Sequence, residues 1–244
     1  MRVAVVSDIH GNLTALDAVI ADLETVGADL IVHGGDLVGS GARQAEVIDR
    51  IRDLKWPGVY GNTDEMLWHP DRLAAQLSAP ALRRLREIVF GQCTATLDDI
   101  GTDRLAWLRA LPMEWSGEGL AVVHASPGDV WKSPSFDATD DELANTYGPL
   151  ASARVVYGHI HRSFVRQLPA FVVANSGSVS LSYDGDPRAA YALIDDGATA
   201  IRRVAYDIER ELTALEQARF PGAAWVGAML RAGAFVPPPT EEPR

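Results

Sequence analysis

Seven side chains of types that bind metal ions occur at five places in the chain, each directly after a short apolar run. The seven are Asp8, His10, Asp36, Asn62, His124, His159 and His161. The apolar runs have the length and composition of buried β-strands, so each place is the carboxyl end of a predicted strand. Open α/β sheets bind their ligands at this edge. The sequence therefore predicts that the seven side chains form one site.

The composition of this set indicates the kind of metal and the kind of chemistry. Imidazole nitrogens combined with carboxylate and amide oxygens, without a thiolate, suit divalent Mn, Fe, Co, Ni or Zn. Seven ligands exceed what one tetrahedral ion needs and suit two ions that share one carboxylate. Two such ions, ~3.5–4 Å apart, activate a bridging water and hold a phosphoryl group for in-line attack. We therefore predict a dinuclear hydrolytic site, with manganese among the candidate metals; a structural or vestigial site is the alternative.

The first half of the chain alternates between predicted strands and helices. Apolar runs and helical spacing predict these elements: strands over residues 3–6, 30–32, 58–60, 120–123 and 155–157, and helices over 12–26 and 47–54. The βαβαβ order at the start indicates a parallel sheet. The sheet would bring the polar ends of its strands to one edge.

Two other regions have a different character. Residues 65–112 are mostly helical in pattern, and we interpret them as a helical cap inserted into an α/β domain. Residues 129–150 are acidic and poorly periodic, a loop with one short helix over 140–147. Close-set strands follow over 171–174, 191–194 and 200–204, which we expect to be antiparallel, and then two terminal helices. We predict a single domain over residues 1–236 and a flexible tail over 237–244.

Composition limits the class of protein. The chain of 244 residues is 47% hydrophobic and 23% charged, which is typical of a packed globular protein. Its net charge of −11 argues against a duplex nucleic acid partner. The single Cys93 excludes an internal disulfide and fits a reducing compartment. No apolar run reaches the ~18 residues of a membrane helix, and residue 1 opens into a strand, so we expect a soluble, cytoplasmic protein without membrane contact; its oligomeric state is left open.

The order of these motifs resembles a known family. Asp-x-His at residue 8, Gly-Asp at 36, Gly-Asn-x-Asp at 62, His124 and Gly-His-x-His at 159 are similar to the motifs of the calcineurin-like metallophosphoesterases, over roughly residues 1–206. Residues 175–179 and 184–191 resemble its small bacterial and archaeal branch of phosphodiesterases and phosphatases. The resemblance implies an α/β fold of two packed mixed β-sheets flanked by helices, a four-layer sandwich.

The resemblance also implies how the ligands are divided. It assigns Asp8, His10 and His161 to one metal ion, Asn62, His124 and His159 to the other, and Asp36 as the bridge between them. It implies a metal-dependent phosphoric ester hydrolase with a small phosphate-ester substrate. We expect a phosphodiester or phosphomonoester, with nucleotides among the candidates, cleaved by a metal-bridging hydroxide. The alternatives are a protein phosphatase and a dinucleoside polyphosphate hydrolase. A non-catalytic metal-binding scaffold is a further, less favoured alternative.

Some residues beside the ligands have two interpretations each. Asp36, Asn62, Asp64 and Arg162 are the catalytic candidates, although Asp64 is better suited to capping the following helix or orienting Asn62 than to proton transfer. Arg162 is either a surface charge or a ligand of a phosphate oxygen. Asn12 is close enough to His10 to contact substrate. His33 is interpreted as a core or hydrogen-bonded residue, not as a ligand.

Residue 63 departs from the family pattern. Many relatives have a histidine after the asparagine, where it can protonate the leaving group or hold the phosphate. This chain has Thr63. A threonine hydroxyl does not supply a proton near neutral pH as an imidazolium does, so the general acid is unassigned.

Overall fold

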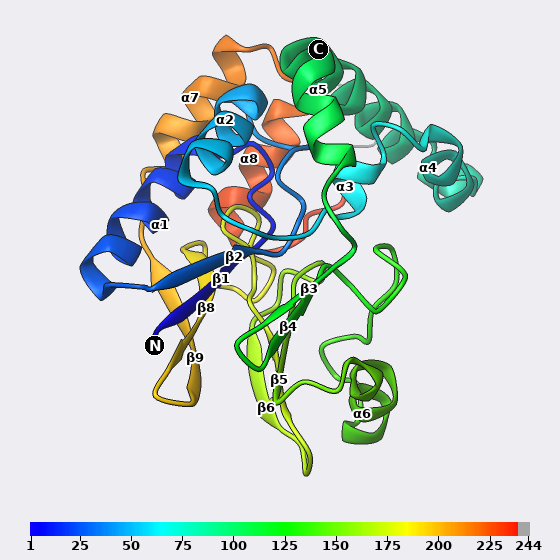
Figure 1. The fold of residues 1–244 in the computed structure, drawn as a ribbon. Coiled ribbons are helices and arrows are strands. Elements are labelled where there is room, and N and C mark those ends of the chain that lie inside the picture. The colour runs from blue at the N-terminus through cyan, green and yellow to red at the C-terminus, as the bar shows by residue number, and fades with distance from the viewer. Residues whose placement is uncertain (239–244) are drawn as a thin grey trace.

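The computed structural model describes residues 1–238 and contains two β-sheets packed against each other, with helices on both sides (Figure 1). The first sheet has the order β2-β1-β8-β9 and the second the order β3-β4-β5-β7-β6. Each sheet contains parallel and antiparallel pairs of strands. The predicted fold class of two mixed sheets flanked by helices is therefore confirmed.

The elements have these bounds. The strands are β1 Val3–Val6, β2 Leu30–His33, β3 Glu114–Gly117, β4 Leu120–Val123, β5 Arg154–Tyr157, β6 Phe164–Gln167, β7 Val172–Asn175, β8 Ala189–Asp195 and β9 Ala198–Val204. The helices are α1 Leu13–Val26, α2 Gln44–Leu54, α3 Asn62–Glu65, α4 Pro70–Gln76, η1 Pro80–Leu82, α5 Arg83–Arg109, α6 Asp140–Tyr147, η2 Gly148–Leu150, α7 Ile208–Gln217 and α8 Ala223–Ala232.

Strand β1 shows why the sheets stack as they do. All four of its side chains are buried, and they alternate between two cores. Val3 and Val5 pack against the second sheet, in a core shared with Leu120. Ala4 and Val6 pack on the opposite face, against α1 and α2. An uninterrupted apolar strand is what a sheet covered on both faces requires.

The helices lie mainly over the first sheet. In Figure 1, α1, α2, α7 and α8 lie above that sheet, and the long α5 stands beside α2, with which it is in contact. Helix α6 covers the outer face of the second sheet, where its Leu143 and Tyr147 pack against that sheet's side chains. Helix α5 is broken at Gly101, which has a φ of 66°. The helical character predicted for residues 65–112 is confirmed for most of that range.

Three details differ from the sequence prediction. Residues 58–60 do not form a strand, because only Gly58 pairs, through a single bridge to His33. Strands β8 and β9 pair antiparallel as expected, but β7, which corresponds to the predicted strand over 171–174, lies in the other sheet, parallel to β5 and antiparallel to β6. Strands β3 and β6 were not predicted individually, and their alternating exposed and half-buried residues, with glutamate, serine and glycine in β3, explain why no apolar run marked them. The flexible tail predicted over residues 237–244 lies almost wholly outside the described residues.

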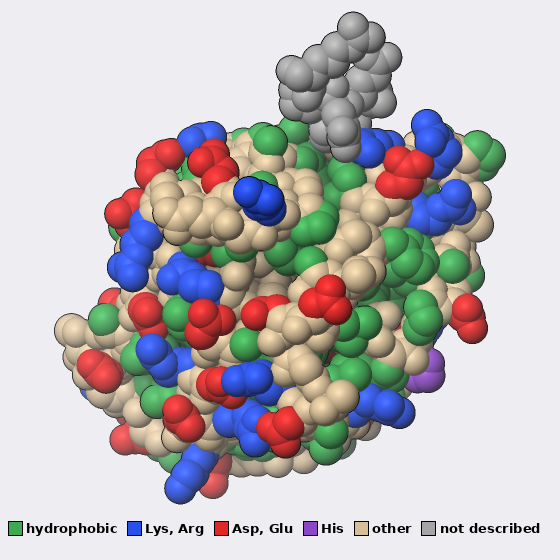
Figure 2. Space-filling model, turned by 90° about the horizontal axis from the view of Figure 1, so that it is seen from above, with side chains coloured by type: hydrophobic (Ala, Val, Ile, Leu, Met, Phe, Trp, Pro, Cys, Tyr) green, Lys and Arg blue, Asp and Glu red, His purple; other side chains and the backbone are tan. Residues whose placement is uncertain are grey.

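The surface above the helices carries both signs of charge. Lys and Arg side chains are interspersed with Asp and Glu side chains on this face (Figure 2). Within residues 1–238, no helix is both long and apolar enough to cross a membrane. The expectation that duplex nucleic acid is not a partner stays a prediction.

A buried carboxylate on α7 connects this helix to α1 and to the loop before α2. Glu211 of α7 is 0% exposed. It accepts hydrogen bonds from the hydroxyl of Thr14 at 2.7 Å and from the guanidinium of Arg43 at 2.5 Å. These contacts of Glu211 with Thr14 and Arg43 hold α7 against α1 and the loop before α2.

Replacing Glu211 with alanine should lower the free energy of unfolding by about 3–5 kcal/mol, because it leaves the partly buried Arg43 without its counter-charge. Chemical denaturation monitored by circular dichroism measures the change. Glu216→Ala, at an exposed position of the same helix, is the matched control and should change the stability little. Equal effects of the two substitutions would show that the ion pair does not anchor α7.

Candidate metal centre

The seven predicted side chains lie at one edge of the two sheets. Asp8 and His10 follow β1, Asp36 follows β2, His124 follows β4, and His159 and His161 follow β5. Asn62 opens α3. All of them are buried or nearly so, apart from the half-buried His159. The structure thus brings together residues far apart in the sequence, such as Asp8 and His161, which are 153 positions apart.

The loops that carry these ligands hold unusual backbone conformations. Asp8, His10, Asp36, His159 and His161 all have φ between 51° and 67°, in the left-handed region that non-glycine residues rarely adopt. The backbone is held there by cross-loop hydrogen bonds, such as Asp8 N–H to the Gly35 carbonyl at 3.0 Å. Such conformations cost of order 1–3 kcal/mol each and concentrate at functional sites.

Four of the residues form one compact group. A ligand atom from each of Asp8, His10, Asp36 and His161 lies within 4.8 Å of the others. Nε2 of His10 is 3.1 Å from Nε2 of His161, and Nε2 of His161 is 3.0 Å from Oδ1 of Asp8. Oδ2 of Asp36 is 3.8 Å from Nε2 of His10. This group contains one of the two ligand sets that the family resemblance implied, together with the bridging carboxylate.

A second group lies on the other side of Asp36. Oδ1 of Asn62 is 2.8 Å from Nε2 of His124 and 2.8 Å from Nδ1 of His159. Nε2 of His124 is 3.5 Å from Oδ1 of Asp36. The two oxygens of the Asp36 carboxylate therefore face different groups, Oδ2 toward His10 and Oδ1 toward His124.

The hydrogen bonds of the histidines test whether these residues fit a cation. Nδ1 of His161 lies 2.6 Å from the carbonyl oxygen of Leu181, and Nδ1 of His124 lies 2.9 Å from that of Gly34. A carbonyl oxygen only accepts, so each Nδ1 donates, and in the neutral ring each Nε2 carries a lone pair. The Nε2 of His161 then faces the Asp8 carboxylate, acceptor against acceptor. A divalent ion between them removes this repulsion, so the residues fit a metal.

The pKa values of two imidazoles of the site agree with metal binding. Burial lowers the pKa of His10 and of His159 to about 4, so both imidazoles are neutral at pH 7 and free to coordinate. Burial also opposes protonation of His124, but the carboxylates of Asp36 and Asp8 outweigh it and raise the pKa of this imidazole. The imidazoles of His10 and His159 are therefore in the neutral form that a divalent cation needs, and metal binding at His124 competes with a proton.

Two glycines make room for the carboxylates. A Cβ on Gly61 would overlap Oδ1 of Asp36, and a Cβ on Gly158 would overlap Oδ2 of Asp8. In place of a side chain, the backbone N–H groups of Thr63 and His159 approach these carboxylates at 2.8 Å and 3.1 Å. The glycine that directly precedes Asn62 and the one that precedes His159 were the sequence signal for this contact.

Both carboxylate oxygens of Asp64 accept hydrogen bonds from the loops around the centre. Its Oδ1 accepts from the N–H groups of Leu37 and Val38 at 3.0 Å and 3.2 Å, and its Oδ2 accepts from Gly61 N–H at 2.9 Å. Burial and then the nearby Asp36 carboxylate raise the pKa of Asp64 to about 7. The side chain therefore ties the loop of Asp36 to the start of α3, and its role in orienting the ligands stays a prediction.

Replacing Asp64 with alanine should weaken metal binding by roughly 10- to 100-fold, the usual effect of removing a residue that orients ligands. Three N–H groups lose their acceptor, and the loop of Asp36 loses its link to Asn62. Competition titration with a fluorescent chelator measures the affinity. Asp71→Ala, at an exposed position of α4, is the control. An Asp64→Ala protein that binds metal as the wild type does would rule out this orienting role.

The other predicted residues lie as follows. Asn12 is fully buried, and its amide is used twice, as the cap of α1 through Ala15 N–H and as a donor to the Ser180 hydroxyl at 3.1 Å. Arg162 is exposed, and its guanidinium lies 4.8 Å from the ring centre of Phe136. Their substrate contacts stay predictions. His33 is fully buried and does not belong to the compact group of ligands, as expected, and its ring lies 6.4 Å from that of Trp107.

Sequence reasoning missed the groups that orient the histidines. The carbonyls of Leu181 and Gly34 fix the imidazoles of His161 and His124, and the ring of Tyr183 stacks on His161 with centres 4.6 Å apart. Backbone carbonyls leave no mark in a sequence. Tyr183 lies 22 residues after His161, in a loop whose sequence has no periodicity that would mark this contact.

Comparison with known proteins agrees with this geometry. Residues 1–197 match the calcineurin-like phosphoesterase superfamily domain. The chain is 30% identical to MJ0912, an uncharacterized protein of Methanocaldococcus jannaschii, over 95% of this chain and 98% of the relative. A metallophosphoesterase structure from Sphaerobacter thermophilus is 26% identical, with a TM-score of 0.77 over 96% of this chain and 100% of that one. The hypothetical protein PH1004 from Pyrococcus horikoshii OT3 shares the fold, with a TM-score of 0.81 and 20% identity over 96% and 99% of the chains.

The chain therefore belongs to the calcineurin-like phosphoesterase superfamily. The resemblance drawn from its sequence motifs is confirmed at this level.

Proposed function

We propose that this protein hydrolyses a small phosphodiester or phosphomonoester with two divalent metal ions. The observation that carries the proposal is the position of Asp36 between two groups of ligands. One of its oxygens faces His10 at 3.8 Å and the other faces His124 at 3.5 Å. A carboxylate shared in this way is the element that distinguishes a dinuclear site from a single-ion site.

Each ion would have its own set of protein ligands. Asp8, His10 and His161 would hold one, Asn62, His124 and His159 the other, and Asp36 both. Bound divalent ions supply positive charge at the phosphoryl oxygens and lower the pKa of water so that hydroxide is available near neutral pH. The identity of the metal is open among Mn, Fe, Co, Ni and Zn, which suit this mixed nitrogen and oxygen set.

The chain's own residues prepare the centre. Thr63 N–H and His159 N–H fix the two carboxylates, and the carbonyls of Leu181 and Gly34 fix two of the imidazoles. Ligand atoms held in place cost no reorganisation when a phosphate binds. Arg162 directly follows His161 and lies over the ring of Phe136, and we assign it the binding of a phosphate oxygen and not a chemical step.

The test is an assay of metal-reconstituted protein on mono-, di- and cyclic nucleotide phosphates and on aryl phosphoesters. A phosphopeptide and a dinucleoside polyphosphate in the same panel separate the two enzymatic alternatives. We expect metal-dependent release of phosphate or phosphomonoester from at least one small ester. Metal binding without hydrolysis of any member would instead favour the non-catalytic scaffold.

A further inference from the structure

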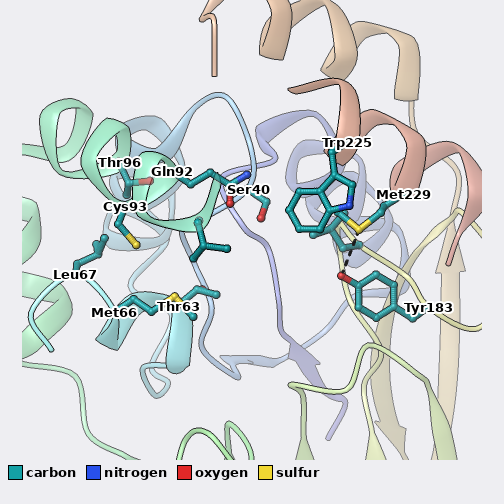
Figure 3. Close-up of a pocket in the computed structure, with 13 residues that line it drawn as sticks. Ser40, Thr63, Met66, Leu67, Gln92, Cys93, Thr96, Tyr183, Trp225 and Met229 are labelled. Atoms are coloured by element: carbon teal, nitrogen blue, oxygen red, sulfur yellow. Dashed lines mark hydrogen bonds between the residues drawn. The ribbon is translucent and has the colours of Figure 1, made fainter. Parts of the chain in front are cut away.

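A cavity of about 100 Å³ lies between the helices and the edge of the first sheet (Figure 3). Five parts of the chain form its walls: the loop after β2, α3 with the residues after it, α5, the loop after β7, and α8. Thirteen residues line it, among them Gly39, Thr63, Cys93, Thr96, Tyr183 and Trp225. In Figure 3, Cys93, Thr96 and Leu67 lie on one side and Trp225, Met229 and Tyr183 on the other.

The cavity shares a wall with the candidate metal centre. Thr63 donates its N–H to Oδ1 of Asp36 at 2.8 Å, and Tyr183 stacks on the ring of His161. Gly39 lies against His10, whose Nδ1 would be 3.4 Å from a Cβ at this glycine. Thr63, Tyr183 and Gly39 therefore form the wall between the cavity and the ligand side chains.

The walls define what the cavity accepts. None of the thirteen lining residues carries a charge, and most of them are aliphatic, aromatic or sulfur-containing. Two polar atoms stand out. The hydroxyl of Thr96 on α5 is fully buried and has no hydrogen-bond partner, and Nδ1 of His10, next to Gly39, is also buried without one. Such a pocket suits an apolar group with one or two polar atoms, because buried polar atoms cost free energy until they are paired.

We propose that this cavity binds the leaving group of the substrate, and that this leaving group is an uncharged alcohol built on a single apolar ring. The proposal rests on the hydrolytic function proposed above. Thr63 ties the cavity to the site of reaction, because it lines the cavity and its N–H donates to the carboxylate of Asp36. A water oxygen joins phosphorus, the bond from phosphorus to the ring oxygen breaks with its electron pair on that oxygen, and a water proton neutralises it.

The size of the cavity limits the size of the leaving group that it can bind. An apolar cavity of roughly 150 Å³ holds one benzene ring. The space of about 100 Å³ is smaller than this, so it takes up part of one ring, and the rest of the ring lies on the side of the metal centre. It does not suit a purine base together with its ribose. Nucleoside leaving groups are thus expected to be poor, and phenol-type leaving groups good.

A filling variant tests the proposal by activity. Cys93→Phe places a ring in the cavity from α5, while Thr94→Phe places the same side chain at the next, exposed position and is the matched control. With 4-nitrophenyl phosphate, Cys93→Phe should lower kcat/KM by about 10-fold or more, the scale on which a pocket discriminates by size. With acetyl phosphate, whose leaving group is small and has no ring, the change should stay within about 2-fold. Equal losses on both substrates would overturn the assignment.

A binding measurement tests it without hydrolysis and without a variant. The chain has a single cysteine, so the rate at which iodoacetamide alkylates the protein reports on Cys93 alone. Phenol should slow this alkylation saturably, and cyclohexylmethyl-ammonium, which carries a charge, should not. Absence of protection by phenol would contradict the proposal. Protection without hydrolysis of any phosphoester would uphold a ring-binding cavity and reject the proposed function, whereas hydrolysis without protection would do the reverse.

Discussion

Replacing Asp36 with asparagine is expected to lower kcat/KM by about 10³-fold or more and to remove at least one equivalent of bound metal. The carboxylate faces both ligand groups, at 3.8 Å from His10 and 3.5 Å from His124, so its charge acts on both ions. Metal ions contribute several kcal/mol of charge stabilisation in the transition state. At 1.36 kcal/mol per factor of ten, a loss of about 4 kcal/mol gives this reduction.

Steady-state kinetics and elemental analysis of the purified variant measure the two effects. Asp53→Asn, at an exposed position of α2, makes the same chemical change outside the site and should retain both rate and metal. His33→Gln should also retain most of both, because His33 does not belong to the compact group of ligands. Two equivalents of metal and near-normal turnover in Asp36→Asn would remove Asp36 from its role as the bridge.

The second large effect concerns residue 63. We expect turnover to fall steeply as the pKa of the leaving group rises, so that aryl esters are cleaved well and alkyl esters poorly. General-acid assistance is worth ~10²–10⁴-fold, and this chain lacks the residue that would supply it. The hydroxyl of Thr63 already donates to the carbonyl of Val38 at 2.7 Å, and its N–H donates to Asp36. Neither group is free to protonate a leaving oxygen.

A series of phosphoesters whose leaving groups span several pKa units measures this dependence. Thr63→Ala should leave the rate on aryl esters almost unchanged. Thr63→His should raise the rate on alkyl esters if the ring comes within hydrogen-bond reach of the leaving oxygen. A flat dependence, with the chemical step shown to limit the rate, would mean that another residue supplies the proton. Asp64 would be the first to mutate.

The site residues that could be predicted from sequence are those of a metal-binding type that also stand at the end of a predicted strand. Asp8, Asp36 and His124 each end an apolar run, and a strand delivers such a residue to the edge of a sheet whatever the details of its pairing. The predicted grouping of these residues therefore did not depend on the strand that was wrongly predicted over residues 58–60. Asn62 reaches its place although residues 58–60 pair through one bridge only.

Other features depend on contacts that no local pattern records. Strand β7 is four residues long and buried on most of its length, so its sequence does not tell whether β5 beside it runs parallel or antiparallel. The cavity is built from five separate segments, and Met66, Cys93 and Trp225 look in the sequence like ordinary core residues. The left-handed backbone of His159 is likewise imposed by its hydrogen bond to Asp8 and not by its own preference.

The central claim is that one carboxylate joins two metal ions in this protein. It is tested most directly by titrating the metal-free protein with Mn²⁺ while recording its electron paramagnetic resonance spectrum and its phosphoesterase rate together. Ions that share Asp36 lie close enough for their spins to couple. The account predicts a multiline, exchange-coupled spectrum that grows with the rate up to two equivalents and is absent from Asp36→Asn. A six-line spectrum of isolated Mn²⁺ with full activity at one equivalent would contradict it.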